Sequence, residues 1–327
     1  MKINVVYTLN NSFVPQVAAS IESILCNKEI ADEIEVYLIG ENISDKNMGK
    51  LNHQVNKFQQ KVHFIPLQQL STLIGFEFDT GGWNQIVLAR LFLDKLLPED
   101  VEKVIYLDGD TIIRGSLRKL WETDLSEAVI AMAPEPTVNK ERKNFLGLNT
   151  EPYCNAGVLL INLDLWKNES YEKKILDYYK QNNGKLFAND QDALNAVLKD
   201  SRIILSPTYN YFNVYDQYSY SYLKKLIYPA KFISKEEFLK VKQNPTIIHY
   251  LGEERPWRVG NKHRFKKDFE NSLYSSGWSD MKFEKGWELY FKFFYLFNGL
   301  TRPFPMIRYH IMNILIPYFI RFRAKGL

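Results

Sequence analysis

Cysteine is scarce in this chain of 327 residues, which contains only Cys26 and Cys154. Two cysteines are too few for a disulfide framework. Neither belongs to a Cys-x-x-Cys motif that would indicate a zinc or thioredoxin-type site. A chain of this length buries a sizeable core without covalent cross-links. The low cysteine content is therefore typical of a protein from a reducing compartment.

Long apolar runs are also missing. No stretch approaches the roughly 18 apolar residues that span a bilayer, and the first residues lack the apolar segment of a secretory signal. Hydrophobic residues make up 46% and charged residues 24% of the chain, as in ordinary globular proteins, which excludes a largely disordered or fibrous protein. We therefore expect a cytoplasmic protein with one large domain or two modest ones.

Acidic residues are absent from residues 289–327, where six basic residues lie. This tail carries more positive charge than the +4 of the whole chain, so the preceding body is slightly negative. A nucleic-acid-binding protein usually carries a basic stripe along its fold, and we expect no nucleic-acid partner.

The same tail is rich in aromatic and aliphatic residues at helical spacing. Arg308, Arg321 and Arg323 lie among them, and a kink is expected at Pro317. This combination is typical of an interfacial helix on an anionic membrane, here the inner face of the plasma membrane. A helix packed on the body or in a homo-oligomer is the alternative.

Short apolar runs alternate with segments of helical periodicity along the first 250 residues. The runs predict strands at residues 3–9, 34–39, 62–67, 104–107, 129–133, 158–163 and 246–250. Helices are predicted at residues 15–26, 85–97 and 190–199. This alternation predicts an α/β fold with a mostly parallel central sheet, in which ligands bind beyond the carboxyl ends of the strands.

The most specific segment is KVIYLDGDTII, in which an apolar strand ends at Asp108 and Asp110. Gly109 between them is expected to let the backbone turn tightly, so that both carboxylates face one ligand and bind Mg²⁺ or Mn²⁺. An apolar run before Asp-x-Asp-x-Thr is also the first motif of haloacid-dehalogenase-type phosphatases, with Asp108 as nucleophile and Asp110 as general acid/base. Those enzymes usually carry it on the first strand, whereas about three strand–helix units precede it here, which favours the metal site.

Six motifs follow one another between residues 3 and 257: VVYTLNNSF, ARLFL, YLDGDTII, YCNAGVLLINL, NDQDALN and IIHYLGEERPW. In this order they resemble the retaining glycosyltransferases of family 8, which include bacterial lipopolysaccharide galactosyl- and glucosyltransferases and glycogenin. The resemblance implies a GT-A fold, with a catalytic domain at residues 1–265 and a helical C-terminal segment at residues 266–327. It implies a metal-dependent hexosyltransferase that moves glucose or galactose from a UDP-sugar to a glycan acceptor.

The resemblance also assigns the metal and diphosphate positions. The metal ligands would be Asp108, Asp110 and His249, which ends the last apolar strand. A nitrogen ligand fits Mn²⁺ better than Mg²⁺, so Mn²⁺ is expected and Mg²⁺ is the alternative. Gly252 would let the backbone approach the diphosphate, and Arg255 would offset its charge, at a position where many members have lysine.

The remaining donor-binding positions lie in the other motifs. They are Thr8, Asn10, Ser12, Arg90, Gly109, Asn155, Ala156, Asp190 and Gln191. Asp190 would accept hydrogen bonds from sugar hydroxyls and Gln191 would lie on the β-face of the anomeric carbon, which makes these two the candidate catalytic residues. Turn formation is the alternative role for Asn10, and a buried ion pair is the alternative for Arg90.

Several neighbouring residues are interpreted from their chemistry alone. The small Ala156 and Gly157 would leave room for a pyranose, Cys154 would pack in the interior, and Asp192 would stabilise a helix N-terminus. Residues 208–222 hold seven aromatic residues and form either a glycan groove or internal packing. The glycine-rich residues 79–85 form either a lid or an ordinary loop.

Two further questions stay open on sequence alone. The reaction proceeds either by front-side attack, with the leaving phosphate taking the acceptor's proton, or by double displacement through Asp190. A membrane-bound scaffold with a degenerate site is the alternative to an enzyme, and the intact set of Asp108, Asp110 and His249 argues against it.

Overall fold

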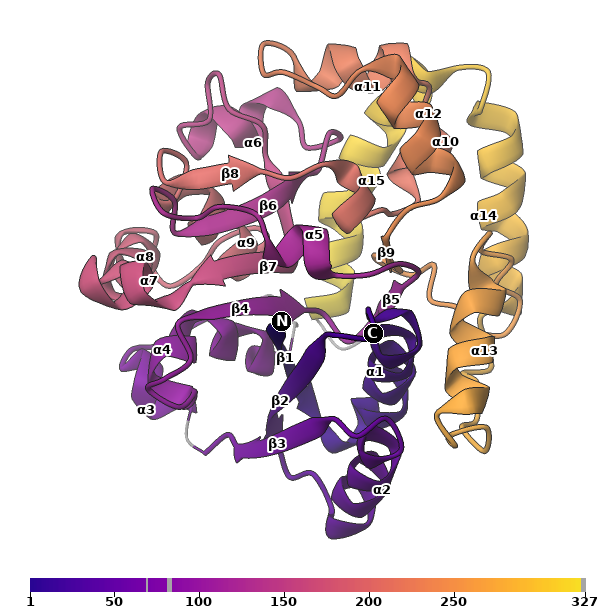
Figure 1. The fold of residues 1–327 in the computed structure, drawn as a ribbon. Coiled ribbons are helices and arrows are strands. Elements are labelled where there is room, and N and C mark those ends of the chain that lie inside the picture. The colour runs from indigo at the N-terminus through magenta and orange to yellow at the C-terminus, as the bar shows by residue number, and fades with distance from the viewer. Residues whose placement is uncertain (69, 81–83, 325–327) are drawn as a thin grey trace.

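The central sheet has seven strands in the order β3-β2-β1-β4-β7-β6-β8 (Figure 1). The structure is a computed structural model and describes residues 1–68, 70–80 and 84–324. The strands of the sheet are β1 (Lys2–Asn10), β2 (Glu33–Glu41), β3 (Lys61–Pro66), β4 (Lys103–Leu107), β6 (Ile130–Pro134), β7 (Cys154–Asn162) and β8 (Arg202–Ile204). A separate two-stranded ribbon pairs β5 (Thr111–Ile113) with β9 (Ile247–His249).

Strand direction determines where the strand ends meet. The pairs β3–β2, β2–β1, β1–β4 and β6–β8 are parallel, whereas β7 runs antiparallel to both β4 and β6. Because β7 is reversed, its first residues lie beside the last residues of β4, with Leu107 opposite Val158. The predicted mostly parallel α/β sheet is confirmed. With β7 reversed, the YLDGDTII and YCNAGVLLINL motifs lie at the same edge of the sheet.

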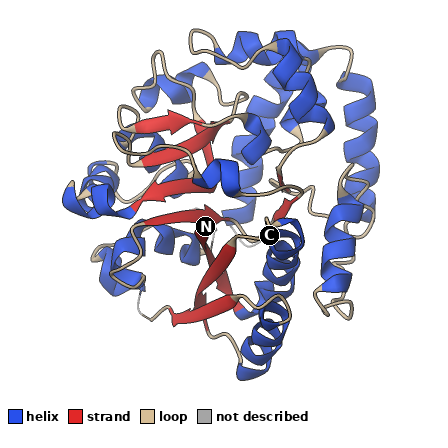
Figure 2. Cartoon of the chain, viewed as in Figure 1, coloured by secondary structure: helices blue, strands red, loops and turns tan. Residues whose placement is uncertain are grey.

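Helices cover both faces of the sheet (Figure 2). The α-helices are α1 (Val14–Asn27), α2 (Asp45–Asn56), α3 (Leu70–Ile74), α4 (Leu93–Leu96), α5 (Arg118–Trp121), α6 (Lys140–Phe145), α7 (Leu163–Asn168), α8 (Tyr171–Gln181), α9 (Asn189–Val197), α10 (Val214–Gln217), α11 (Tyr220–Ile227), α12 (Lys235–Gln243), α13 (Lys266–Ser275), α14 (Glu288–Thr301) and α15 (Pro305–Ala324). The 3₁₀ helices are η1 (Asn11–Phe13), η2 (Gln85–Phe92) and η3 (Pro207–Tyr209).

Two hydrophobic cores lie on opposite faces of the sheet. Side chains alternate along a strand, so in β1 Val5 and Tyr7 join the core beneath α1 and α13, whereas Val6 joins the core beneath η2, α8 and α9. Both faces are buried, which explains why the inner strands read as continuous apolar runs.

Two predicted elements differ from the observed ones. The helix predicted at residues 85–97 is a 3₁₀ helix, η2, followed by the single turn α4. Side chains compete for the local backbone groups here, because Asn84 accepts from the Ile86 N–H and Arg90 Nε donates to the Val87 carbonyl. Strand β7 begins at Cys154 rather than at residue 158, since a register shift in β6 after Met132 lets pairing continue.

The aromatic stretch at residues 208–222 is largely internal. Tyr211, Phe212, Tyr215 and Tyr218 are buried in the core that contains β9 and α12. For these four residues packing is therefore the correct interpretation, and they do not offer open faces to a glycan. Of the glycine-rich residues 79–85 that were considered as a lid, residues 81–83 lie outside the described part of the chain.

The C-terminal helices are α13, α14 and α15. Helix α13 lies beside α1 (Figure 1), and its Phe269 and Leu273 join the core. Among the described residues, no helix combines the length and the apolar character needed to cross a membrane. Pro317 lies inside α15. The expectation that Arg308 accompanies a membrane-facing surface is wrong, because Arg308 is only 2% exposed.

Candidate active site

The acidic pair lies in the turn between β4 and β5. The Asp108 N–H donates to the Gly157 carbonyl at 2.8 Å, and the Thr111 hydroxyl donates to the Asp108 carbonyl at 2.8 Å. Gly109 does not adopt a left-handed conformation. A Cβ at this position would lie 2.7 Å from Val17 Cγ2 and 2.9 Å from the Phe13 ring. Gly109 lies in the predicted tight turn, and the lack of a Cβ there is also required for close packing against Phe13 and Val17.

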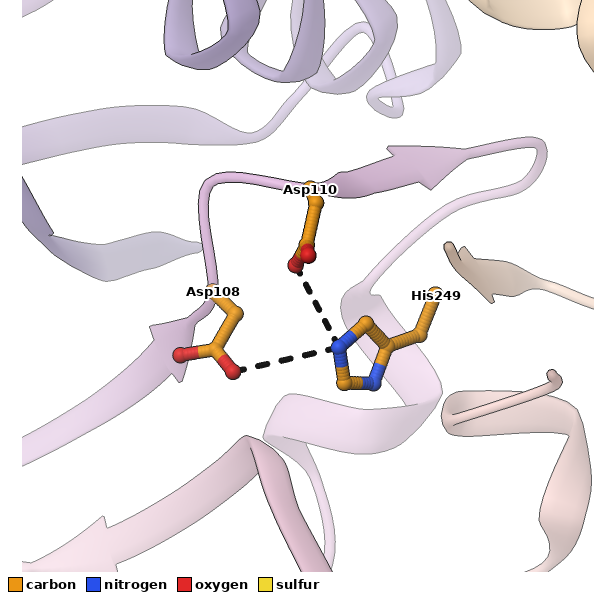
Figure 3. A group of neighbouring side chains, drawn as sticks. All are labelled: Asp108, Asp110 and His249. Carbon is orange, nitrogen blue, oxygen red and sulfur yellow. Dashed lines mark ion pairs between the residues drawn. The ribbon is translucent and has the colours of Figure 1, made fainter. Parts of the chain in front are cut away.

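His249 faces the two aspartates from β9, which pairs with β5 so that His249 lies opposite Thr111. Its Nε2 is 3.3 Å from Asp110 Oδ1 and 3.8 Å from Asp108 Oδ2 (Figure 3). One ligand atom from each of the three residues lies within 4.8 Å of the others. Two carboxylates and an imidazole nitrogen at this spacing fit one divalent metal ion, with positions left for water or ligand oxygens.

A chain of amides determines which His249 nitrogen faces the aspartates. The backbone N–H of Gly157 donates to Asn155 Oδ1 at 2.9 Å, so this oxygen is an acceptor. Asn210 Nδ2 donates to the same oxygen at 2.9 Å, which turns Asn210 Oδ1 toward His249 Nδ1, 2.9 Å away. Nδ1 therefore carries the hydrogen and Nε2 is free for a metal, as in other metal sites where a second partner fixes the tautomer.

Gly157 provides the space for the His249 ring. A Cβ on Gly157 would lie 2.2 Å from His249 Cε1 and 2.6 Å from Nδ1, far inside the usual contact distance of about 3.5 Å. The sequence analysis assigned the space beside Ala156 and Gly157 to a pyranose. At Gly157 that interpretation is wrong, because the imidazole ring fills the space.

The charges in the cluster support one another. Burial alone would raise the pKa of Asp110, but His249 and Arg255 hold it below its ordinary value. Burial alone would lower the pKa of His249, whereas Asp110 and Asp108 raise it. Arg255 Nη2 lies 3.8 Å from Asp110 Oδ2. The negative charges of the two carboxylates are thus offset by Arg255, which is positively charged, and by His249, which gains a positive charge when it is protonated.

Arg90 is a buried cation that joins two acidic groups. Its Nη2 lies 3.2 Å from Asp108 Oδ1 and its Nε 2.9 Å from Asp190 Oδ2. Nη1 donates to the Ala156 carbonyl at 2.6 Å, and the guanidinium lies 4.4 Å from the Tyr106 ring centre. Burial would lower the pKa of Arg90, but Asp108 and Asp190 raise it above its ordinary value, so the side chain stays charged. The buried ion pair that sequence analysis considered as the alternative role of Arg90 is present.

Asp190 and Gln191 begin α9, on the same side of the cluster. Burial raises the pKa of Asp190 to about 6, although Arg90 partly offsets this effect. Gln191 Oε1 accepts from the Ala156 N–H at 2.9 Å, and its Nε2 donates to Glu135 Oε2 at 3.0 Å and to the Tyr153 hydroxyl at 2.9 Å. Both ends of the Gln191 amide are therefore held by fixed partners.

Asp192 has the capping role expected of it and a second one. Its Oδ2 accepts from the N–H of Ala188, the residue that precedes α9. Its Oδ1 accepts from the Tyr153 hydroxyl at 2.7 Å and forms an ion pair with Arg142. Asp192 therefore also holds the tyrosine that contacts Gln191.

The end of β1 and the following 3₁₀ helix η1 lie at the same edge. Thr8 Oγ1 is 2.8 Å from the Tyr106 hydroxyl, which donates to Asp108 Oδ1 at 3.1 Å. Asn10 Oδ1 accepts from the Phe13 N–H and from the Ser12 hydroxyl, at 3.2 and 2.7 Å. Asn10 thus forms the turn that sequence analysis considered as its alternative role.

Gly252, three residues beyond His249, completes the set of predicted positions. It has a left-handed backbone, with φ of +74°, and a Cβ added to it would meet no atom within 4 Å. This conformation favours glycine, and its backbone faces open space.

Three residues of the site escaped the sequence analysis. Tyr106 precedes the acidic pair by two residues and joins Thr8 to Asp108. Asn210 is fully buried and orients His249. Glu135 accepts hydrogen bonds from Asn155 and Gln191. Only Glu135 carried a usable signal, because it directly follows the buried strand β6 and so sits at a strand end like Asp108.

Comparison with known proteins identifies the family of this fold. The family model described as glycosyl transferase family 8 matches residues 4–260. General stress protein A of Bacillus subtilis is 22% identical over 85% of this chain and 95% of its own length. The lipopolysaccharide 1,2-glucosyltransferase of Escherichia coli is 25% identical over 85% of this chain and 79% of its own length.

A solved structure has the same fold. The galactosyltransferase LgtC, in complex with donor and acceptor sugar analogs, matches with a TM-score of 0.71 at 22% identity, over 84% of this chain and 96% of that one. The fold is therefore of the GT-A type. The family match also decides against the phosphatase interpretation of the acidic pair. The chain belongs to glycosyl transferase family 8 and is a retaining glycosyltransferase of the hexosyltransferase type.

Proposed function

We propose that the enzyme transfers glucose or galactose from a UDP-sugar to a glycan acceptor, with Mn²⁺ bound by Asp108, Asp110 and His249. The observation that carries this proposal is the Asp-Asp-His cluster beside the buried Arg90–Asp190 pair. The relatives in E. coli and the LgtC structure are a glucosyltransferase and a galactosyltransferase, which supports a hexose from either series. The acceptor is a surface polysaccharide, a lipid-linked oligosaccharide or a glycoprotein glycan.

Different site residues bind the diphosphate with its metal ion, the nucleoside and the hexose of the donor. Asp108, Asp110 and His249 hold the metal, with Gly109 in the same turn, and Gly252 and Arg255 face the diphosphate. Thr8, Asn10 and Ser12 hold the nucleoside, while Arg90, Asn155, Ala156, Asp190 and Gln191 hold the hexose. This division is supported by the order of the strand ends: β1 and β4 end and β7 begins at one edge of the sheet, and β9 of the separate ribbon ends at His249.

The reaction requires the site to stabilise the negative charge that develops on the diphosphate as UDP leaves. The bound metal ion offsets negative charge on the leaving group. Arg255 adds a second positive charge on the same side, since it lies 3.8 Å from Asp110. Asp190 accepts hydrogen bonds from sugar hydroxyls, and Arg90 keeps it ionised by holding its pKa below what burial alone would give.

We favour front-side attack, in which the acceptor hydroxyl forms its bond to the anomeric carbon on the face that the diphosphate leaves. The leaving phosphate takes the hydroxyl proton. The Gln191 amide supports this route because both its ends are engaged and a neutral amide is a poor nucleophile. Double displacement through Asp190 predicts a hexosyl–enzyme ester. Mass spectrometry of the intact chain after reaction with a 2-fluoro-hexose donor tests it, and a mass gain of one fluorohexosyl group would overturn front-side attack.

The test of donor and metal is release of UDP from UDP-glucose and UDP-galactose with Mn²⁺, Mg²⁺ or EDTA. We expect slow hydrolysis of one donor with Mn²⁺, loss of activity in EDTA, and loss in Asp110→Asn. Asp200→Asn is the matched control, because Asp200 is exposed and lies after α9, away from the cluster.

The outcomes of this assay separate the alternatives. Metal-dependent UDP binding without turnover of either donor, with or without added oligosaccharide, would favour a non-catalytic scaffold. Turnover that EDTA leaves intact would contradict the metal site.

We also propose that residues 266–327 form a unit that attaches the catalytic domain, residues 1–265, to the cytoplasmic face of an anionic membrane. Four apolar residues of α14, which lies at the outer edge of the molecule (Figure 1), are between 57% and 66% exposed. They are Leu289, Phe293, Leu296 and Leu300. Their spacing of four, three and four residues puts them on one helix face, beside the exposed Lys292 and Arg302. The side chains of Arg321 and Arg323 and all of Lys325 lie outside the described part.

Sedimentation with phosphatidylglycerol vesicles tests the attachment. We expect Leu296→Asp to reduce the bound fraction severalfold, because a charge on this face opposes burial among lipid chains. Leu239→Asp on α12 is the control, since Leu239 is 49% exposed but lies outside the α14 face. Equal binding of Leu296→Asp and the parent, or dimerisation through α14 in solution, would favour the alternative of packing between copies.

A further inference from the structure

The segment that carries Arg255 has no strand or helix of its own. We call residues 252–258 the Arg255 loop. It consists of turns and begins at Gly252 with a left-handed backbone. Arg255 points back toward the metal cluster, with Nη2 3.8 Å from Asp110 Oδ2. Among the described residues, backbone pairing in this loop is limited to one bridge, between Arg258 and Glu284, so the position of Arg255 depends largely on the contacts that flank it.

One side of the loop is fastened to the segment before α14. Arg258 is 6% exposed, and its Nε donates to Glu284 Oε2 at 2.8 Å. Trp257 Nε1 donates to the other oxygen, Glu284 Oε1, at 2.9 Å. The Arg258 guanidinium lies 3.5 Å from the Trp287 ring centre. The backbones also pair, because the Glu284 N–H donates to the Trp257 carbonyl at 2.9 Å.

The other side of the loop is fastened through Glu254, which is 8% exposed. Its carboxylate accepts from Asn213 and, at 3.0 Å, from Gln217 Nε2. Tyr218 follows Gln217 in the sequence, and its ring centre lies 5.8 Å from the guanidinium of Arg308 on α15. The positive charge of Arg308 acts on Glu254, whose pKa burial raises and Arg308 lowers.

Arg308 is itself held in the hairpin of α14 and α15. It is 2% exposed, and its Nη1 donates to Asn298 Oδ1 at 2.7 Å and to the Thr301 hydroxyl at 3.0 Å. A buried arginine bonded to two neutral groups still requires a negative partner nearby. Its guanidinium lies over the Tyr218 ring, and Gln217, the residue before Tyr218, donates to the acidic Glu254, so packing links the two charged groups through this segment. Arg308 therefore faces the interior, whereas Lys292 and Arg302 of the same hairpin and the apolar face of α14 are exposed.

We propose that Glu284 and Arg308 are positioning residues for Arg255, so that the C-terminal hairpin forms part of the donor-binding machinery. Glu284 holds the loop after Arg255. Arg308 holds it before Arg255 by packing on Tyr218, whose neighbour Gln217 binds Glu254. This inference rests on the proposed function, in which Arg255 contacts the donor diphosphate. It predicts that changes at Glu284 and Arg308, 29 and 53 residues beyond Arg255 in the sequence, weaken diphosphate binding through Arg255 alone.

The test is a double-mutant cycle on the full-length chain, read as the dissociation constant of UDP in the presence of Mn²⁺. Arg308→Met keeps the length of the side chain and removes its charge. We expect it to weaken UDP binding about tenfold, within the range for residues of one network. In an Arg255→Ala background the same change should weaken binding less than about twofold. Arg308→Lys should restore part of the affinity, and Arg302→Met is the exposed control on the same hairpin.

Each result bears on one claim. If Arg308→Met weakens UDP binding equally with and without Arg255, its role is general stability and the inference is wrong. If Arg255→Ala leaves UDP affinity unchanged, the proposed role of Arg255 fails first. If Arg308→Met does not fold, Glu284→Gln replaces it in the cycle, because glutamine keeps the acceptor for Trp257 and removes the charge facing Arg258. The same loss in both backgrounds would overturn the proposal there too.

Discussion

Replacement of Gly157 by alanine tests the proposed metal site without replacing any of its ligands. The added Cβ would lie 2.2 Å from His249 Cε1. Carbon atoms in contact are about 3.5 Å apart, so the ring or the strand must move by about 1.3 Å. Ligand distances in metal sites vary by only about 0.2 Å. The displacement is therefore several times what the site tolerates, and it also strains the hydrogen bond from His249 to Asn210.

We expect Gly157→Ala to weaken Mn²⁺ binding in the presence of UDP by about 10- to 100-fold, as loss of ligand orientation does in other metal sites. Overpacking should lower the free energy of unfolding by about 1–3 kcal/mol. We expect the variant to fold, and thermal unfolding measures this loss of stability. Titration calorimetry or electron paramagnetic resonance of Mn²⁺ measures the affinity. Gly115→Ala is the control, because a Cβ there would lie 3.6 Å from Thr246 Cγ2, an ordinary contact.

A second background makes the result specific to His249. In His249→Ala the ring is gone, and adding Gly157→Ala should then change Mn²⁺ affinity by less than about twofold, as expected when one variant acts through the other. Parent-like affinity in Gly157→Ala alone would refute the reasoning, because it would mean that the His249 ring does not occupy this space or does not bind the metal.

Three further changes test other parts of the site. Arg90→Met should lower the free energy of unfolding in urea by about 3–5 kcal/mol, because Asp108 and Asp190 lose their buried cation; a change below about 1 kcal/mol would contradict this. The folded-state pKa of Glu254 is about 7, above its ordinary 4.5, so its stabilising effect is full below pH 4.5 and is lost as the pH rises through 7, which amounts to about 3 kcal/mol. Glu254→Gln should flatten that part of the stability–pH curve, and an unchanged curve would count against the shift. Burial raises the pKa of the Cys154 thiol to about 11, so Cys154→Ala should keep kcat and lose only about 1 kcal/mol of stability; loss of turnover in a folded variant would point to a catalytic thiol.

Local patterns were sufficient for the sheet and for the acidic pair. The strand before Asp108 was predicted because an apolar run with a turn at its end reports burial and termination within a few residues. The buried ion pair considered for Arg90 followed from the cost of burying a charge without a partner. The helix at residues 85–97 was predicted wrongly, because periodicity alone does not distinguish α from 3₁₀ geometry when side chains bond to the local backbone.

Residues that act across long sequence separations escaped the same reasoning. Asn210 is 39 residues from His249 and 55 from Asn155, and it lies among aromatic residues that suggested a ligand groove. Glu135 had the signal of a strand-end acid, but only the reversed strand β7 brings it to Asn155 and Gln191. Arg308 looked like a membrane-facing charge because its sequence neighbours are basic and apolar.

The sequence by itself determined the α/β class and the strand end at which Asp108 and Asp110 lie, since each of these depends on contiguous residues. Only the tertiary structure decided the rest: that Gly157 makes room for His249, that Asn210 sets its tautomer, and that Arg308 is buried. These features depend on which side chains meet when distant segments pack. That outcome reflects excluded volume and the pairing of buried polar groups, which no local pattern encodes.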